Sequence, residues 1–125
     1  MYEILKLHKT CLFYLRMTKI SYHLNFLSAG LETLIACRTF ITDAGLSSVV
    51  RHLPRLSHLD VEGCASLTSQ GIVNFPTFCQ NLRFLNVSFC LKIKTFVVED
   101  VRRKISSLHK VEMRGLHIAE CLDEN

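Results

Sequence analysis

A pattern of apolar residues repeats along the chain at a constant offset. Leu56 and Leu82 are as far apart in the sequence as Leu82 and Leu108. The same order of apolar residues occurs three times, as Leu56, Leu59, Val61, Cys64 and Leu67, then Leu82, Leu85, Val87, Cys90 and Ile93, then Leu108, Val111, Met113, Leu116 and Ala119. Self-similarity at a period of this length is typical of a solenoid, in which each repeat is one supersecondary unit. The order Leu-x-x-Leu-x-Leu-x-x-Cys predicts a short strand followed by a turn and a helical return.

An earlier copy is one residue out of step with these three. Leu31, Leu34 and Ala36 form its strand, and we expect the turn over residues 37–40 to absorb the difference. The segment that follows predicts the clearest helix of the chain, with an inward face at helical spacing formed by Leu46, Val49, Val50 and Leu53. Thr42 or Asp43 is placed to cap the amides of its first turn. Pro54 ends the helix because proline cannot continue the hydrogen-bond ladder.

The two later helical returns differ from this one. Pro76 interrupts the second return, which should therefore be short or kinked. The third return, over residues 93–105, is expected to place Phe96, Val97, Val101 and Ile105 inward. The same spacing leaves a cationic set outward, namely Lys92, Lys94, Arg102, Arg103 and Lys104.

The chain therefore divides into three parts. Residues 1–30 are interpreted as a degenerate N-terminal repeat or cap, with Ile4 and Leu5 in a worn strand, because a terminal repeat shields one open end of the core. Residues 31–119 hold the cysteine-containing repeats, and residues 120–125 form a polar tail. We predict an α/β solenoid with parallel strands on its concave face and helices on its convex face.

Composition supports a globular domain. Of the 125 residues, 49% are hydrophobic and 21% charged, and the net charge of +4 is not gathered into one block of like sign. No apolar run approaches the roughly 20 residues needed to cross a bilayer. Residues 1–15 lack the features of an export signal. We therefore expect a cytoplasmic location, with the nucleus as an alternative, and no membrane partner.

Four of the six cysteines, Cys11, Cys37, Cys64 and Cys90, recur at steps that are equal to within one position and match the period of the apolar pattern. In a solenoid such residues stack along the axis, one per repeat, and act as small buried hydrophobes. A ladder of disulfides is the alternative, but a reducing compartment favours free thiols. Metal binding is disfavoured because the chain has no Cys-x-x-Cys or Cys-x-x-His pair.

The repeat resembles a known class. Residues 82–90, Leu-Arg-Phe-Leu-Asn-Val-Ser-Phe-Cys, together with residues 41–46, Ile-Thr-Asp-Ala-Gly-Leu, are similar to the cysteine-containing leucine-rich repeats of F-box/LRR-repeat proteins and of antagonist-of-mitotic-exit-like proteins. The resemblance covers residues 31–116 and implies a curved solenoid that recruits substrates to a cullin-based SCF ubiquitin ligase in the ubiquitin conjugation pathway. In that family a separate F-box docks to the ligase. Residues 1–30 are too short to hold one, so only the recognition half carries over.

Strand alternation places the residues between the leucines on the open, concave face. Three strands thereby define a grid of nine predicted partner-binding residues: His58, Asp60, Glu62, Phe84, Asn86, Ser88, Lys110, Glu112 and Arg114. Asp60 and Glu62 form an acidic end and Lys110 and Arg114 a basic end, with Phe84 as an aromatic anchor between them. Such a surface suits a bipolar peptide. The alternative is that these are ordinary solvated strand residues.

Catalysis and nucleic-acid binding are the competing functions. His58 and Asp60 face the same way, but no nucleophile accompanies them, and thiols at the buried turn stay protonated. No glycine-rich phosphate loop or paired metal ligands occur, so no enzyme activity, cofactor or metal is expected. The outward cations of residues 92–104 belong to one repeat. A nucleic-acid surface would need a basic stripe that continues over several.

Protein recognition without catalysis is thus the predicted function, most specifically as the substrate-binding repeat region of an F-box-type ubiquitin-ligase subunit. The alternative is a scaffold subunit of a larger assembly, such as a ciliary or axonemal dynein regulatory complex, in which similar repeats occur. A further reading is a fragment whose open end is covered by additional repeats, because three repeats are about the minimum for an independent array.

Overall fold

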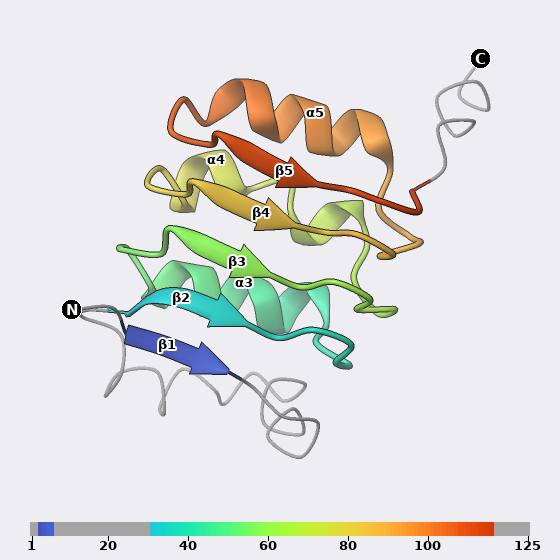
Figure 1. Cartoon of the computed structure of the whole chain (residues 1–125), viewed down its shortest axis with the longest axis horizontal. Coiled ribbons are helices and arrows are strands. Elements are labelled where there is room, and N and C mark those ends of the chain that lie inside the picture. The colour runs from blue at the N-terminus through green and yellow to red at the C-terminus, as the bar shows by residue number, and fades with distance from the viewer. Residues whose placement is uncertain (1–2, 7–30, 117–125) are drawn as a thin grey trace.

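The structure is a computed structural model that describes residues 3–6 and 31–116 of the chain. Five short strands form one sheet in the order of the sequence, and every neighbouring pair is parallel (Figure 1). The strands are β1 (Glu3–Lys6), β2 (Leu31–Ile35), β3 (His58–Asp60), β4 (Phe84–Asn86) and β5 (Lys110–Glu112). Sequential parallel strands need crossover connections, and those between β2 and β5 carry the helices.

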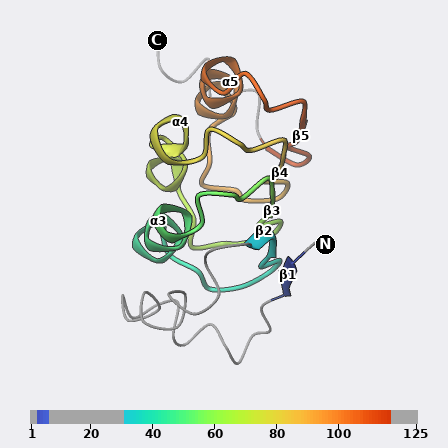
Figure 2. The ribbon, with the colours of Figure 1, turned by 90° about the vertical axis from the view of Figure 1, so that its left-hand side faces the viewer.

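The helical segments lie in a second layer on one side of the sheet (Figure 2). They are α3 (Asp43–His52), the short 3-10 helix η2 (Ser69–Gly71), α4 (Phe75–Phe78) and α5 (Thr95–Lys104). The prediction of an α/β domain with an all-parallel sheet and helices on one face is confirmed, and the arrangement is consistent with a leucine-rich-repeat-like coil. No helix in the described ranges has the length and apolarity to span a membrane.

The first helix follows its prediction closely. Thr42 is the N-cap of α3, and its Oγ1 accepts a hydrogen bond from the Gly45 amide at 3.1 Å. Leu46, Val49 and Val50 are buried against the sheet. Asp43 does not cap this helix; its carboxylate instead accepts hydrogen bonds from the backbone amide of Thr68, at 2.8 Å, and from the Thr68 hydroxyl.

The helical segments that follow β3 and β4 confirm one prediction and correct another. The segment around Pro76 is broken into η2 and the four-residue α4, as the proline predicted. On α5 the inward face was wrong in part, because Phe96 is 43% exposed while Val98 is fully buried. Helical geometry explains the difference: Val98, Val101 and Ile105 lie three and four residues apart and share one face.

The core consists of columns of equivalent residues from successive repeats. Leu34, Leu59 and Leu85 lie opposite one another in the sheet and have no exposed surface. The predicted slip is confirmed, because the step along the chain from Leu34 to its partner Leu59 is one position shorter than the step from Leu59 to Leu85. Ala36, Val61 and Val87 form the next column, and all three are fully buried.

The slip corrects the predicted cysteine column. Cys64 and Cys90 are fully buried, as expected, and each thiol donates to a backbone carbonyl of the preceding repeat, at 3.0 Å to Ala36 and 3.1 Å to Val61. Cys37 is only half-buried, because the shorter step between β2 and β3 puts Thr39 in the buried position instead. The four cysteines of the described ranges are free thiols, and Cys11 lies outside those ranges.

The turn after each strand from β2 to β5 contains one residue in the left-handed region. These residues are Arg38, Gly63, Phe89 and Gly115, with φ between 55° and 78°. They recur at the same register as the strands, so the turn geometry repeats even though the side chains differ. Of the predicted N-terminal repeat, β1 is described and pairs in parallel with β2. The remainder of residues 1–30 and the predicted tail at 120–125 lie outside the described residues.

Candidate interaction surface on the open face of the sheet

The structure brings the nine predicted residues together as three rows on the face of the sheet that points away from the helices. His58, Phe84 and Lys110 are register partners, as are Asp60, Asn86 and Glu112. The third row, Glu62, Ser88 and Arg114, is joined through the left-handed turns: the Gly63 amide donates to the Ser88 carbonyl at 2.8 Å, and the Phe89 amide to that of Arg114 at 2.7 Å. We call these nine residues the grid.

The first row forms an aromatic and cationic stack. The rings of His58 and Phe84 lie nearly parallel, with centroids 4.1 Å apart and an interplanar angle of 16°. The ammonium of Lys110 lies 5.8 Å from the Phe84 centroid, within the range of a cation–π contact. Both rings are half-buried and Lys110 is exposed. Phe84 is thus held between two neighbours, with part of its surface open to solvent.

The charges of the grid pair with one another. Glu62 Oε1 lies 3.4 Å from the Arg114 guanidinium and accepts a hydrogen bond from the Asn86 amide at the same distance. Glu112 lies 3.7 Å from Arg114 and 3.5 Å from Lys110. The predicted acidic and basic ends are therefore linked across β4, and their charges partly neutralise each other.

Two of the nine residues are buried and accept hydrogen bonds from backbone amides. Asn86 is 4% exposed and Ser88 is fully buried. The Asn86 side-chain oxygen accepts from the Ser88 amide at 3.0 Å, and the Ser88 hydroxyl accepts from the Arg114 amide at the same distance. Asp60 repeats the first of these contacts one strand earlier, where it accepts from the Glu62 amide at 3.1 Å. Asn86 and Ser88 lie in the grid, but they offer little surface to a partner.

Sequence reasoning omitted a fourth strand from this face. Thr33 and Ile35 of β2 pair with His58 and Asp60, so the same rows continue onto β2 with half-buried residues. Cys37 follows them in the position equivalent to Glu62. Burial, and then the neighbouring Asp60 carboxylate, raise the pKa of the Cys37 thiol to about 12. The alternation of Leu34 and Ala36 was the signal that would have found these residues.

The buried thiols of the turn are poorly suited to nucleophilic chemistry. Burial raises the pKa of Cys64 above its ordinary value and that of Cys90 to about 11. A thiol is a weak nucleophile until it ionises, so both stay protonated and act as hydrogen-bond donors at neutral pH. In residues 3–6 and 31–116 no group of three His, Cys, Asp or Glu side chains is arranged to hold a metal ion.

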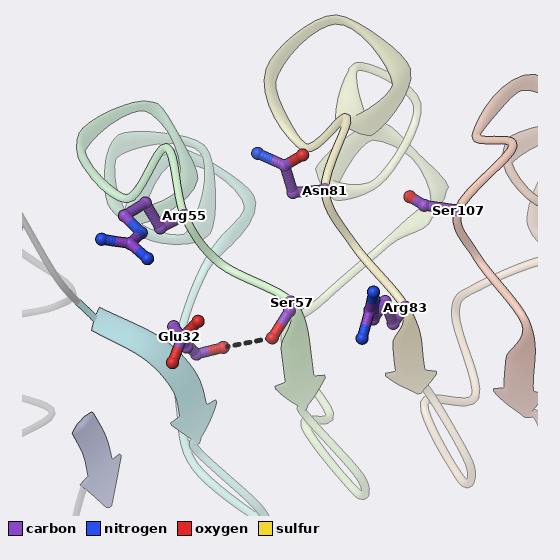
Figure 3. Close-up of a pocket in the computed structure, with 6 residues that line it drawn as sticks. All are labelled: Glu32, Arg55, Ser57, Asn81, Arg83 and Ser107. Carbon is purple, nitrogen blue, oxygen red and sulfur yellow. Dashed lines mark hydrogen bonds between the residues drawn. The ribbon is translucent and has the colours of Figure 1, made fainter. Parts of the chain in front are cut away.

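A second feature, which sequence reasoning missed, is a polar hollow at the N-terminal ends of the strands (Figure 3). Its volume is about 460 Å³. The residues that line it come from four successive repeats and are Glu32, Arg55, Ser57, Asn81, Arg83 and Ser107. No apolar pattern marks these positions, and their proximity follows only from the superposition of the repeats.

A comparison with protein-family models finds none that matches this chain.

Proposed function

We propose that this protein is a leucine-rich-repeat recognition module, without catalytic activity, that binds a protein partner through the open face of its sheet. The observation that carries this proposal is the stack of His58, Phe84 and Lys110 on three adjacent strands. An aromatic ring fixed by its neighbours offers contact area at a small cost in side-chain entropy, which is the property of an interface hot spot.

The charged network beside this stack supplies selectivity. Glu62 and Arg114 satisfy each other in the free protein, so a partner must offer replacement groups or leave the pair intact. A partner segment with an apolar or aromatic residue for the Phe84 site, flanked by polar groups, meets both conditions. We propose that Asp60, Glu112 and the half-buried residues of β2 form the rim of this contact.

The assembly in which such a module works is proposed from the resemblance of its repeats. The first candidate is the substrate-binding repeat region of an F-box-type SCF ubiquitin-ligase subunit, in the cytoplasm or nucleus. The alternative is a scaffold subunit of a larger complex, such as an axonemal dynein regulatory complex. The two differ in the proteins that accompany the chain.

A matched pair of variants tests the binding face. Phe84 on β4 and Phe96 on α5 both lie beneath a lysine ammonium at 5.8 Å, but they occupy opposite layers of the fold. Proteins captured by the tagged wild-type chain are identified by mass spectrometry and compared with those captured by Phe84→Ala and Phe96→Ala. We expect Phe84→Ala to lose a direct partner that Phe96→Ala retains.

The identity of the partners decides between the two assemblies. If the proteins that Phe84→Ala still captures include a cullin and its adaptor, they support membership of a ubiquitin ligase. If they include axonemal proteins, they support the scaffold. Equal retention of every captured protein by both variants, with both variants folded by circular dichroism, would contradict the assignment of the open face.

A further inference from the structure

The polar hollow at the start of the strands is built by the repeat itself. Successive backbone bonds connect equivalent positions there: the Ser57 amide donates to the Glu32 carbonyl at 2.9 Å, and the Arg83 amide to the Ser57 carbonyl at 2.8 Å. In Figure 3, Arg83 lies on one side of Ser57, and Arg55 and Glu32 lie on the other. All four of these residues line the same hollow.

Most of the small polar groups in the hollow are already engaged. The Ser57 hydroxyl donates to the Glu32 carbonyl at 3.3 Å, and the Ser107 hydroxyl donates to the Leu82 carbonyl at 2.7 Å. The Asn81 side-chain amide donates to the Pro54 carbonyl at 3.1 Å. These bonds join one repeat to the preceding one, so the hydroxyl protons are committed to the fold and only one amide proton of Asn81 is left over.

The two arginines are different. Both are exposed, and neither makes an ion pair or side-chain hydrogen bond with any residue of the described ranges, whereas the arginines of α5 pair with carboxylates of their own helix. Their guanidinium groups are therefore the main uncommitted donors of the hollow. Against these two positive charges the lining holds one negative charge, that of Glu32.

From this balance of donors and charge we propose that the hollow is a binding site for an anionic side chain of a partner peptide, held by the guanidinium groups of Arg55 and Arg83. Guanidinium groups match the paired oxygens of carboxylate and phosphate, and these charge-assisted bonds are the strongest of their kind. The anion is either the carboxylate of Asp or Glu or the phosphate of phosphoserine. This site lies at the N-terminal ends of the strands, and the proposal does not depend on the function proposed for the open face.

Fluorescence anisotropy with the full chain tests the proposal. The probes are three labelled peptides of alternating alanine and a second residue, which is glutamate, phosphoserine or, in the neutral control, glutamine. The wild-type chain should bind at least one anionic peptide and not the neutral one, with an affinity that falls as salt rises. Tighter binding of either anionic peptide supports the site and identifies the anion. Equal binding of all three peptides would overturn it.

Substitutions with opposite expected signs locate the site. Arg83→Gln and Arg55→Gln should each weaken the anionic peptide by about fivefold, because each removes one charge-assisted contact at an exposed position. Glu32→Gln should strengthen it by about twofold, because it removes the opposing charge. A gain of affinity cannot result from loss of folding, so this variant keeps the test decisive.

The matched control is Arg103→Gln. Arg103 is an exposed arginine of α5, with 74% of its side chain accessible, and its removal changes the net charge by the same amount. We expect this variant to bind the anionic peptide as the wild type does. If Arg103→Gln weakens binding as much as Arg83→Gln, the attraction comes from the net charge of the protein, and the proposal is wrong.

Discussion

The ring of Phe89 occupies the space that a side chain on Gly115 would need. A Cβ atom at Gly115 would lie 2.4 Å from Phe89 Cδ1. Both residues occupy the left-handed position of their turns, one repeat apart, with φ of 60° and 78°. Arg38 and Gly63 repeat the relationship, with the Arg38 side chain 2.9 Å from such a Cβ. A large side chain in one turn thus lies over a glycine in the next.

The first prediction concerns these two glycines. Gly115→Ala should destabilise the fold by about 2–3 kcal/mol, because alanine is disfavoured at this φ and its methyl group also meets the Phe89 ring. Gly63→Ala should cost only about 1 kcal/mol, because the flexible Arg38 side chain can move aside. Urea unfolding of the two variants measures the difference. Equal losses would show that the ring does not block the turn.

The second prediction concerns the strained turn residue itself. Phe89 has φ of 60°, which is costly for a bulky residue and costs glycine nothing. Phe89→Gly should therefore be more stable than Phe89→Ala by about 1 kcal/mol, the reverse of the order found at ordinary positions. Thermal unfolding of the two variants gives the order directly. As a control, the same pair of substitutions at Leu91, which lies outside the left-handed region, should favour alanine.

The third prediction concerns the link between α3 and the next repeat. The Asp43 carboxylate accepts from the amide and the hydroxyl of Thr68, and both residues are half-buried. Asp43→Ala should cost about 2 kcal/mol, because it leaves two partly buried donors without an acceptor. Asp100→Ala, on α5, removes exposed ion pairs to Arg103 and Lys104, which solvent screens, so it should destabilise the fold much less than Asp43→Ala. Comparable losses in urea unfolding would contradict this assignment.

The fourth prediction is a loss of stability at alkaline pH. Burial raises the pKa of Cys79 to about 12 and that of Cys90 to about 11, and also raises that of Cys64. Above the ordinary thiol pKa of 9.0 the unfolded chain loses these protons while the folded chain keeps them. The unfolded state then binds fewer protons, so the contribution is fully present below pH 9 and is lost as the pH rises toward the folded pKa values.

Urea unfolding at about pH 8 and about pH 10 measures this effect, and we expect a loss of about 1 kcal/mol from each of Cys79 and Cys90, with a further loss from Cys64. Tyrosine and lysine also titrate in this range. The control is therefore a chain in which the three cysteines are replaced by serine, which should lose distinctly less stability over the same interval. An identical dependence in both chains would exclude the thiols as its source.

Much of the fold was predictable because the apolar frame is periodic. A strand that alternates Leu59 with Val61 fixes which residues are buried, and a proline at position 76 fixes where a helix breaks. The error at Cys37 shows the limit of this reasoning. Matching Cys37 to Cys64 made this step one position longer than the next, but the backbone register makes it one position shorter, and a threonine takes the buried place.

The candidate sites were less predictable than the fold. Alternation placed His58 and Phe84 on one face, but it could not tell that Ser88 on that face would be fully buried. Burial there depends on the side chains of neighbouring repeats, which a single strand does not reveal. The hollow with Arg55 and Arg83 was missed for a related reason, since its residues lie outside the apolar frame and become neighbours only when repeats superpose.

The side-chain bonds between repeats share a direction. Ser57, Cys64, Asn81, Cys90 and Ser107 each donate to a carbonyl in the preceding repeat. A repeat that leaves the ribosome therefore finds its hydrogen-bond acceptors already in place on the repeat synthesised before it. Synthesis from the N-terminus thus matches the order in which these hydrogen bonds can form, and each new repeat can dock as it emerges without waiting for the next.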